Sequence, residues 1–216
     1  MKLMTTTQVS VDGVMQGPGG PGEDERGVFE RGGWAHFDKE AGTVMDEIFR
    51  RADAFLFGRR TYEIFAGSWG TWKDPGDSPI WTALHTKPKY VASTTLTDPR
   101  WTNTTVLSGD VAAAVRELKA KPGRELQVQG SGALIRWLLD NQLVDEITLF
   151  TFPVVVGQGM RLFPDTGPDI ALATGPPGAR SIQLPPRLEH GWGRATARLV
   201  AECGVSPGGC SPPSSR

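Results

Sequence analysis

Two short glycine turns constrain the fold of this chain more than any other feature, because each stands between a strand-like and a helix-like segment. The first turn, Gly58-Arg59-Arg60, follows the apolar run Ala54-Phe55-Leu56-Phe57. The second, Gly130-Ser131-Gly132, follows a strand-like run at 125–129 and opens a helix-like run at 132–138. A short, unbroken apolar run is typical of a strand that is buried on both faces. Strand–turn–helix units of this kind indicate a parallel sheet covered by helices.

The rest of the first 152 residues repeats this alternation. Apolar residues recur at the spacing of one buried helical stripe from about Asp38 to Ala52. A second amphipathic helix, which either Ser108 or Asp110 can cap, ends at Pro122-Gly123. Further strands are expected at residues 2–11, 90–93, 104–107 and 145–152. The chain is therefore predicted to have an α/β fold, with a mostly parallel twisted sheet flanked by helices.

Composition excludes several classes of protein. The 216 residues fit one domain, and 23 basic against 24 acidic residues leave a net charge of −1. This charge gives no electrostatic argument for a nucleic-acid partner or an anionic membrane. No stretch approaches the roughly 18 apolar residues of a membrane span, and the N-terminus does not read as a signal peptide, so a cytoplasmic location is expected. Cys203 and Cys210 show no zinc spacing, and the three histidines show no ligand spacing, so no metal site is predicted.

Glycine and proline gather in two segments. The first, residues 13–33, is predicted to be a long loop, and loops of that length in compact domains are usually functional or mobile. The second begins at Pro164, after which the periodicity fades. We therefore expect a folded domain over residues 1–165. Residues 166–216 are expected to form a Pro/Gly-rich, partly disordered tail with at most one or two weak strands.

The two turns are candidate phosphate sites. A helix N-terminus presents unpaired N–H groups and partial positive charge, and glycine lets the backbone approach a phosphate closely. Arg59 and Arg60 could hold a 2′-phosphate or a pyrophosphate with paired hydrogen bonds. In the alternative interpretation, the glycines only permit tight turns and the arginines are ordinary surface charges.

An ordered set of short motifs resembles one family within the dihydrofolate reductase fold. The family is the branch that contains the reductase domain of bacterial riboflavin biosynthesis. The motifs that carry the resemblance, in chain order, are 10–15, 57–63, 89–96, 129–132, 143–146 and 153–159. The resemblance implies NADPH as the cofactor, hydride transfer as the chemistry, and a homodimer.

The same resemblance implies positions for the cofactor. It places Gly58, Arg59 and Thr61 at the adenosine-side phosphates, and Ser93 and Thr94 near the 2′-phosphate. It places Gly130, Ser131 and Gly132 at the pyrophosphate, and Asp12 and Gly13 beside the nicotinamide.

Hydride transfer to a C=N or C=O group also needs a proton donor or a polarising group. Dihydrofolate reductases use a carboxylate on the helix after the first loop. Here Asp38, about 60° from the centre of the apolar stripe, is the helix acid best placed to line a cleft. Its alternative role is to cap the helix. Asp12 is a second candidate, with an Asp-Gly turn as its alternative role.

Together with these residues, the resemblance implies an NADPH-dependent reductase that acts on a small heterocyclic or carbonyl compound, such as a pterin or an aminopyrimidine. The alternative is a catalytically weak nucleotide-binding module or sensor. Four tryptophans (Trp34, Trp69, Trp72 and Trp81) could form a flat pocket for a heteroaromatic substrate, or could instead cover a hydrophobic edge or a dimer surface.

Overall fold

The computed structural model describes residues 1–73, 76–163, 165, 173–174, 182–183 and 196–201. The strands within these residues are β1 (Lys2–Ser10), β2 (Ala52–Gly58), β3 (Lys89–Ala92), β4 (Thr104–Leu107), β5 (Glu125–Gln129), β6 (Glu146–Phe152), β7 (Ala173–Thr174), β8 (Ile182–Gln183) and β9 (Thr196–Ala201). The helices are α1 (Lys39–Arg51), α2 (Arg59–Ser68), α3 (Pro79–Thr86), α4 (Val111–Ala120) and α5 (Gly132–Asp140).

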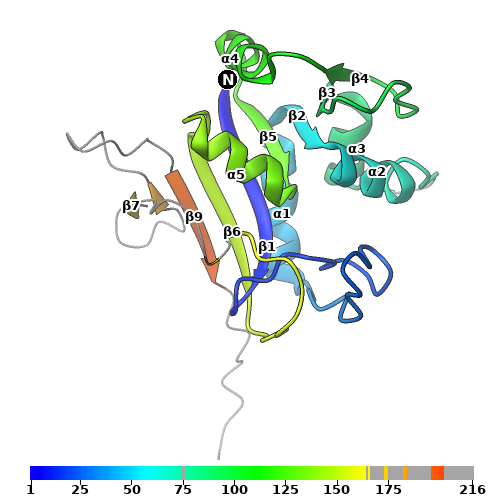
Figure 1. Ribbon diagram of the computed structural model, residues 1–216, viewed down its shortest axis with the longest axis vertical. Helices are drawn as coiled ribbons and strands as arrows, with labels where there is room; N and C mark the ends of the chain where they lie inside the picture. The colour runs from blue at the N-terminus through cyan, green and yellow to red at the C-terminus, as the bar shows by residue number, and fades with distance from the viewer. Residues whose placement is uncertain (74–75, 164, 166–172, 175–181, 184–195, 202–216) are drawn as a thin grey trace, which may run out of the picture.

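Strands β1 to β6 form a parallel sheet in the order β4-β3-β2-β5-β1-β6. The three later strands are joined beyond β6. Figure 1 shows β9 lying beside β6. All the parallel strands end at the same edge of the sheet. The predicted α/β fold, with a mostly parallel sheet flanked by helices, is confirmed.

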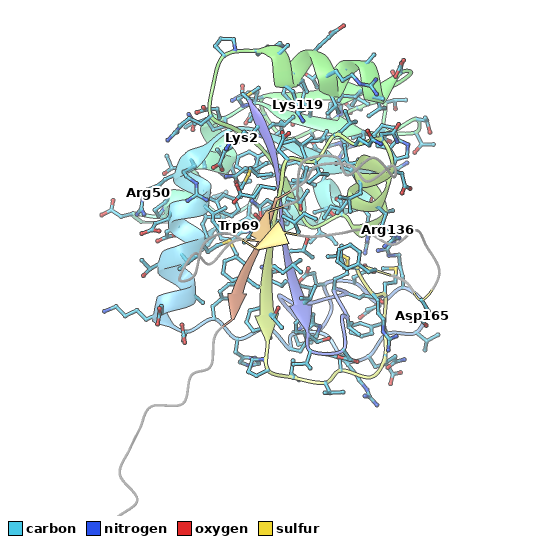
Figure 2. The ribbon with its side chains drawn as sticks, turned by 90° about the vertical axis from the view of Figure 1, so that its left-hand side faces the viewer. Lys2, Arg50, Trp69, Lys119, Arg136 and Asp165 are labelled. Carbon is cyan, nitrogen blue, oxygen red and sulfur yellow. The ribbon has the colours of Figure 1, made fainter. Side chains whose placement is uncertain are left out.

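Helices cover both faces of the sheet. The first hydrophobic core lies between one face and helices α4 and α5, and it contains Leu56, Val128 and Ile135, all fully buried. The second lies between the other face and helices α1 and α3, and it is rich in aromatic residues such as Phe55 and Phe57. In Figure 2, Arg50 of α1 and Arg136 of α5 lie on opposite sides of the molecule. The unbroken apolar sequence of β2 follows from this arrangement, because successive side chains of the strand enter different cores.

Local sequence signals account for the helix boundaries. Asp38 caps α1 by accepting a hydrogen bond from the Ala41 N–H at 2.8 Å. Asp110 caps α4 in the same way through the Ala113 N–H at 2.9 Å. Helix α3, which the sequence analysis did not predict, has Ser78 as its cap and Pro79 at its first position. Its eight residues span barely two turns, too short for a clear helical periodicity.

The glycine-rich loop packs back onto the molecule. The Gln16 side chain donates hydrogen bonds to the Asp24 and Arg26 carbonyls at 3.1 and 2.8 Å. Trp34 Nε1 donates to the Gln16 carbonyl at 2.8 Å, and a small core containing Phe29 lies beneath the loop. The predicted long loop is therefore present, and side chains hold it in a defined shape.

The C-terminal region contains more strand than we expected. Within its described residues, three strands join the sheet beyond β6, where we expected at most one or two. Two of the three, β7 and β8, contain only two residues each, which is too short for a period of two to be recognised. The predicted disorder of the tail concerns residues that otherwise lie outside the described part of the chain. Among the helices described, none has the length and apolar character to cross a membrane.

Candidate functional site

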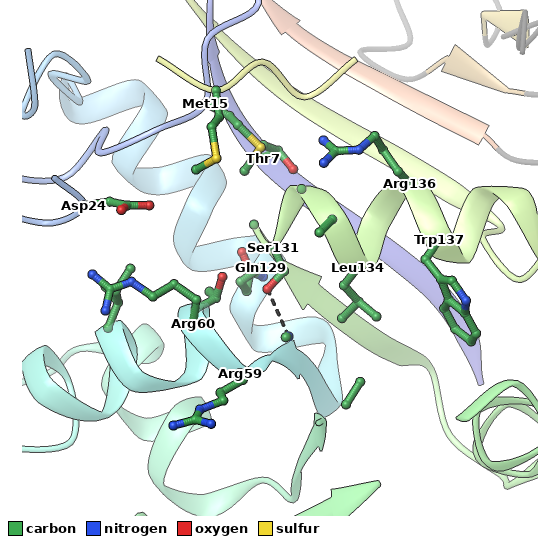
Figure 3. A pocket seen from close by; sticks show the side chains of 18 of the residues that line it. Thr7, Met15, Asp24, Arg59, Arg60, Gln129, Ser131, Leu134, Arg136 and Trp137 are labelled. Carbon is green, nitrogen blue, oxygen red and sulfur yellow. Dashed lines mark hydrogen bonds between the residues drawn. The ribbon is translucent and has the colours of Figure 1, made fainter. Parts of the chain in front are cut away.

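A cleft of about 990 Å³ opens at the carboxyl ends of the parallel strands. Its volume lies at the upper end of the roughly 300–1,000 Å³ that is usual for small-molecule and cofactor sites. The chain leaves β2 toward β3 on one side and leaves β5 toward β6 on the other, so the connections diverge between these adjacent strands. Open α/β sheets bind ligands at such a point. Figure 3 shows the side chains around it.

The two glycine turns meet in the middle of the cleft. The Gly58 N–H donates a hydrogen bond to Ser131 Oγ at 3.0 Å, and the Gly130 N–H donates to the Thr6 carbonyl at 2.8 Å. Gly130 and Ser131 both have positive φ, at 63° and 67°. Ser131 is a non-glycine residue in the left-handed region, and such strain is concentrated at functional sites. These contacts join the middle of β1 to the ends of β2 and β5.

Helices α2 and α5 begin at these turns without a side-chain cap. Gly58 has no side chain, and Ser131 makes no capping hydrogen bond because its Oγ accepts the Gly58 N–H instead. The other three described helices are each capped by a side chain, from Asp38, Ser78 and Asp110. The N–H groups at the start of α2 and α5 are thus left for a ligand, and a helix N-terminus favours an anion.

Two arginines stand beside the first turn. Arg59 pairs with Glu63 at 2.7 Å and donates to Thr95 Oγ1 at 2.6 Å. Arg60 points the other way, toward Asp24 (Figure 3). The pKa of Asp24 is lowered, chiefly by its hydrogen bond from Arg26 and in smaller part by the charge of Arg60. The cleft therefore carries cationic groups on both sides of the turns.

Next to Arg59, the segment after β3 adds hydroxyl groups to the wall. Ser93 Oγ accepts hydrogen bonds from the backbone N–H groups of Thr95 and Leu96, at 3.2 and 3.0 Å. Ser93, Thr94 and Thr95 all line the cleft. This wall could donate hydrogen bonds to a phosphate.

The structure brings together eight of the ten residues that the resemblance placed at the cofactor. They line the cleft: Gly58, Arg59, Thr61, Ser93, Thr94, Gly130, Ser131 and Gly132. The other two, Asp12 and Gly13, do not line it. Gly13 lies in the turn after β1 with φ of 80°.

Neither predicted catalytic carboxylate lines the cleft. Asp38 is exposed and caps α1. Asp12 accepts a hydrogen bond from Ser10 Oγ and from the Val156 and Gly157 N–H groups. These hydrogen bonds, led by the one from Ser10, lower the pKa of Asp12 to about 2. Asp12 therefore joins the end of β1 to the segment after β6 as a carboxylate.

Several residues that line the cleft were not predicted from the sequence. They come mainly from the glycine-rich loop and from α5, and include Gln16, Glu23, Asp24, Arg26, Arg136 and Trp137. Arg136 lies one helical turn beyond Gly132, and that spacing could have identified it. The loop residues gave no comparable signal, because the packing of the loop decides which of them face inward.

The predicted tryptophan pocket is wrong for this cleft, since none of its four members lines it. Trp69 and Trp72 pack against each other, and Trp81 stacks on His85. In the described part of the chain, no cluster of three or more His, Cys, Asp or Glu residues is arranged to hold a metal ion.

Comparison with known proteins finds a matching family model and a curated relative. The model of the RibD C-terminal domain family matches residues 1–174. The uncharacterized protein YyaP of Bacillus subtilis is 26% identical over 169 residues, which cover 76% of this chain and 81% of that protein.

Two solved structures share the fold. A protein from Shewanella sp. PV-4 that is assigned to riboflavin biosynthesis has a TM-score of 0.59 at 23% identity, with 80% of this chain and 88% of that chain covered. A diaminohydroxyphosphoribosylaminopyrimidine deaminase/5-amino-6-(5-phosphoribosylamino)uracil reductase from Thermotoga maritima has a TM-score of 0.50 at 13% identity. That match covers 80% of this chain and 52% of the other, so this chain spans about half of the Thermotoga protein.

Proposed function

We propose that this chain, which belongs to the RibD C-terminal domain family, is an NADPH-dependent reductase of small heterocyclic or carbonyl compounds, of the pterin or aminopyrimidine kind. The Thermotoga protein, which shares the fold, is described as an aminouracil reductase in one of its two activities. We infer the reaction type, a reduction, from this shared fold. We infer the cofactor, NADPH, from the residues that line the cleft.

One observation carries the cofactor assignment: among the helices of the described residues, the two that begin in the middle of the cleft are those without side-chain caps. Their free N–H groups converge where Gly58 and Ser131 meet, and this is a suitable place for a pyrophosphate. Arg59, Thr95 and Ser93 stand together on one side and would hold the 2′-phosphate. The nicotinamide would then lie on the other side of the turns, toward β1 and the glycine-rich loop.

Bound NADPH would supply the hydride, and the protein would supply a proton for the substrate heteroatom. Glu23 is the lining carboxyl group best suited to hold that proton, because burial raises its pKa. Its Oε2 accepts the Gly19 N–H at 2.6 Å, which fixes the side chain on the loop. The other lining carboxylates are engaged, Asp24 with Arg26 and Asp110 as the cap of α4. Glu23 thus takes the role that the sequence analysis assigned to Asp38 or Asp12.

Titration with NADPH, followed by its fluorescence, tests the proposal. Saturable binding is expected, and then loss of the reduced-nicotinamide absorbance when dihydrofolate or aminopyrimidine compounds are added. Glu23→Gln should bind NADPH like the wild type and reduce the substrates more slowly. Failure of the wild-type chain to bind NADPH would refute the proposal.

The second candidate function, a nucleotide-binding module without turnover, is favoured by one observation. Both carboxylates predicted to be catalytic lie outside the cleft lining. NADPH binding with no reduction of any compound in the panel would establish the module instead. A homodimer and a cytoplasmic location belong to the same proposal, and sedimentation of the full chain tests the first of them.

A further inference from the structure

A row of polar side chains, of which Gln127 and Gln129 are buried, runs beneath α1 along β5 and ends at the cleft. Arg51 Nε donates to Glu125 Oε1 at 2.8 Å, at the end of the row far from the cleft. Gln127 Nε2 donates to Glu125 Oε2 at 2.6 Å and to the Ile48 carbonyl at 2.7 Å. Gln129 Nε2 donates to Gln127 Oε1 at 3.1 Å, and Gln129 lines the cleft. The three β5 residues face the same side of the strand because alternate residues do so.

The chemistry of this row fixes which way each amide points. A carboxylate only accepts hydrogen bonds, so Gln127 must turn its NH₂ group toward Glu125. Both hydrogens of that NH₂ group are then used, one on Glu125 and one on the Ile48 carbonyl. The Gln127 oxygen therefore faces Gln129 and can only accept, so Gln129 must turn its own NH₂ group toward it. The carboxylate of Glu125 thus determines, through Gln127, which way the side-chain amide of Gln129 points.

This orientation leaves the side-chain oxygen of Gln129 without a partner among the described residues. The fully buried side-chain polar atoms that lack a partner there are Thr5 Oγ1, Thr7 Oγ1, Trp101 Nε1 and Thr148 Oγ1. Gln129 Oε1 is not one of them, although the residue as a whole is only 5% exposed. Gln129 lines the cleft, and Figure 3 shows it close to Ser131.

We propose that Gln129 Oε1 is a specificity-determining acceptor that binds an N–H group of the ligand in the cleft, and that Glu125 and Gln127 are positioning residues that hold it in this state. The inference rests on the proposed function, and it names one feature of the ligand: a hydrogen-bond donor on an amide or an aromatic amine. Two sources of that donor are compatible with the site. One is the carboxamide of the nicotinamide, and the other is a ring amino group of the substrate.

A comparison of NADP⁺ with its 3-acetylpyridine analogue tests the first source, because the analogue replaces the carboxamide NH₂ with a methyl group. If the carboxamide is the donor, the wild-type chain should bind NADP⁺ more tightly than the analogue, by about 2- to 13-fold for one hydrogen bond. Gln129→Met, which has a similar shape and no acceptor, should remove this preference.

Gln127→Met separates positioning from direct contact. Without the Gln127 oxygen, the Gln129 amide is free to turn over and present its NH₂ group. The preference should therefore fall in Gln127→Met although Gln129 is unchanged. A purely structural role of the row would lower the melting temperature without changing the ratio of the two affinities.

The second source, a ring amino group of the substrate, is tested with dihydrofolate and its analogue without the 2-amino group. The measured quantity is again the ratio of the two binding affinities. A preference for the amino compound that disappears in Gln129→Met assigns the acceptor to the substrate. Equal ratios in the wild type and in Gln129→Met for both pairs of ligands would overturn the inference while leaving NADPH binding, and hence the proposed function, intact. Absence of NADP⁺ binding in the wild type would overturn both.

Discussion

The position of Arg59 in the cleft predicts that this residue determines the preference for NADPH over NADH. Its guanidinium lies between Glu63 and Thr95, beside the Ser93–Thr95 segment that would take the 2′-phosphate. Hydrogen bonds to charged groups contribute roughly 1.5–3 kcal/mol, so Arg59→Ala should weaken NADPH binding about 10- to 150-fold. NADH has no 2′-phosphate and should be affected much less. Paired titrations at matched ionic strength measure the difference.

Arg100→Ala is the matched control for this change. Arg100 is almost fully exposed, pairs with Asp98 and does not line the cleft. Its removal changes the net charge as Arg59→Ala does, and it should alter neither affinity. If Arg59→Ala weakens NADPH and NADH equally, Arg59 holds the turn or the shared pyrophosphate, and the selectivity prediction is wrong.

Lys89 makes a prediction about stability and pH. Its side chain is fully buried, donates to the Leu84 carbonyl at the end of α3, and lies 4.7 Å from the centre of the Trp101 ring. Burial lowers the pKa of Lys89 to about 8, whereas an unfolded lysine titrates near 10.4. Below pH 8 the amine is charged in both states, and the full cost of burying the charge falls on the folded state.

Between about pH 8 and 10.4 the folded state has lost this proton and the unfolded state still binds it, so stability rises with pH. The free energy of unfolding of the wild type should therefore increase across this range relative to that of Lys89→Met, which cannot titrate. Urea denaturation at several pH values measures the difference. Lys121→Met, at an exposed lysine, is the control and should track the wild type. A wild-type curve parallel to that of Lys89→Met would contradict the assignment.

At the scale of elements, the contact between the two glycine turns is open to a direct test. A Cβ atom on Gly58 would lie 3.1 Å from Ser131 Oγ and 3.3 Å from Ser131 Cβ, so Ser131 must shift by a few tenths of an ångström. Gly58→Ala should then weaken the hydrogen bond between the turns and cost about 1 kcal/mol of stability, together with NADPH affinity. Gly42 in α1 has no atom within 4 Å of its Cβ position. Gly42→Ala should stabilise the protein by roughly 0.5–1 kcal/mol, and equal stabilisation by both changes would refute the contact.

Elements also differ in how far the sequence predicts them. Helix α1 was predictable because its apolar residues repeat at helical spacing, and strand β2 because a short, unbroken apolar run before a glycine turn is typical of a buried strand. Helix α3 and strands β7 and β8 were not, because they are too short to show a period. In the site, the glycine turns were predictable because strand, turn and helix are contiguous. Glu23 and Gln129 were not, since the first faces the cleft through loop packing and the second through a row of hydrogen bonds.

At the scale of the whole molecule, the cleft gathers segments that are far apart in the sequence, from the loop near Gln16 to α5 and Arg161. A ligand that contacts all of them binds the folded chain and not the unfolded one, so it must stabilise the fold by mass action. At 100 times its dissociation constant, NADPH should add about 2.7 kcal/mol. In a domain of this size, that corresponds to a rise in melting temperature of roughly 5–11 °C.

The test compares how much each nucleotide raises the melting temperature. NADPH should raise the melting temperature more than NADH at equal concentration, and in Arg59→Ala the two shifts should converge. Adenosine 2′,5′-bisphosphate, which has the 2′-phosphate and no nicotinamide, should stabilise the wild type and lose its effect in Arg59→Ala. Because these shifts need no turnover, they hold equally for a reductase and for a nucleotide-binding module. A melting temperature that no nucleotide moves would therefore count against the cleft as a cofactor site altogether.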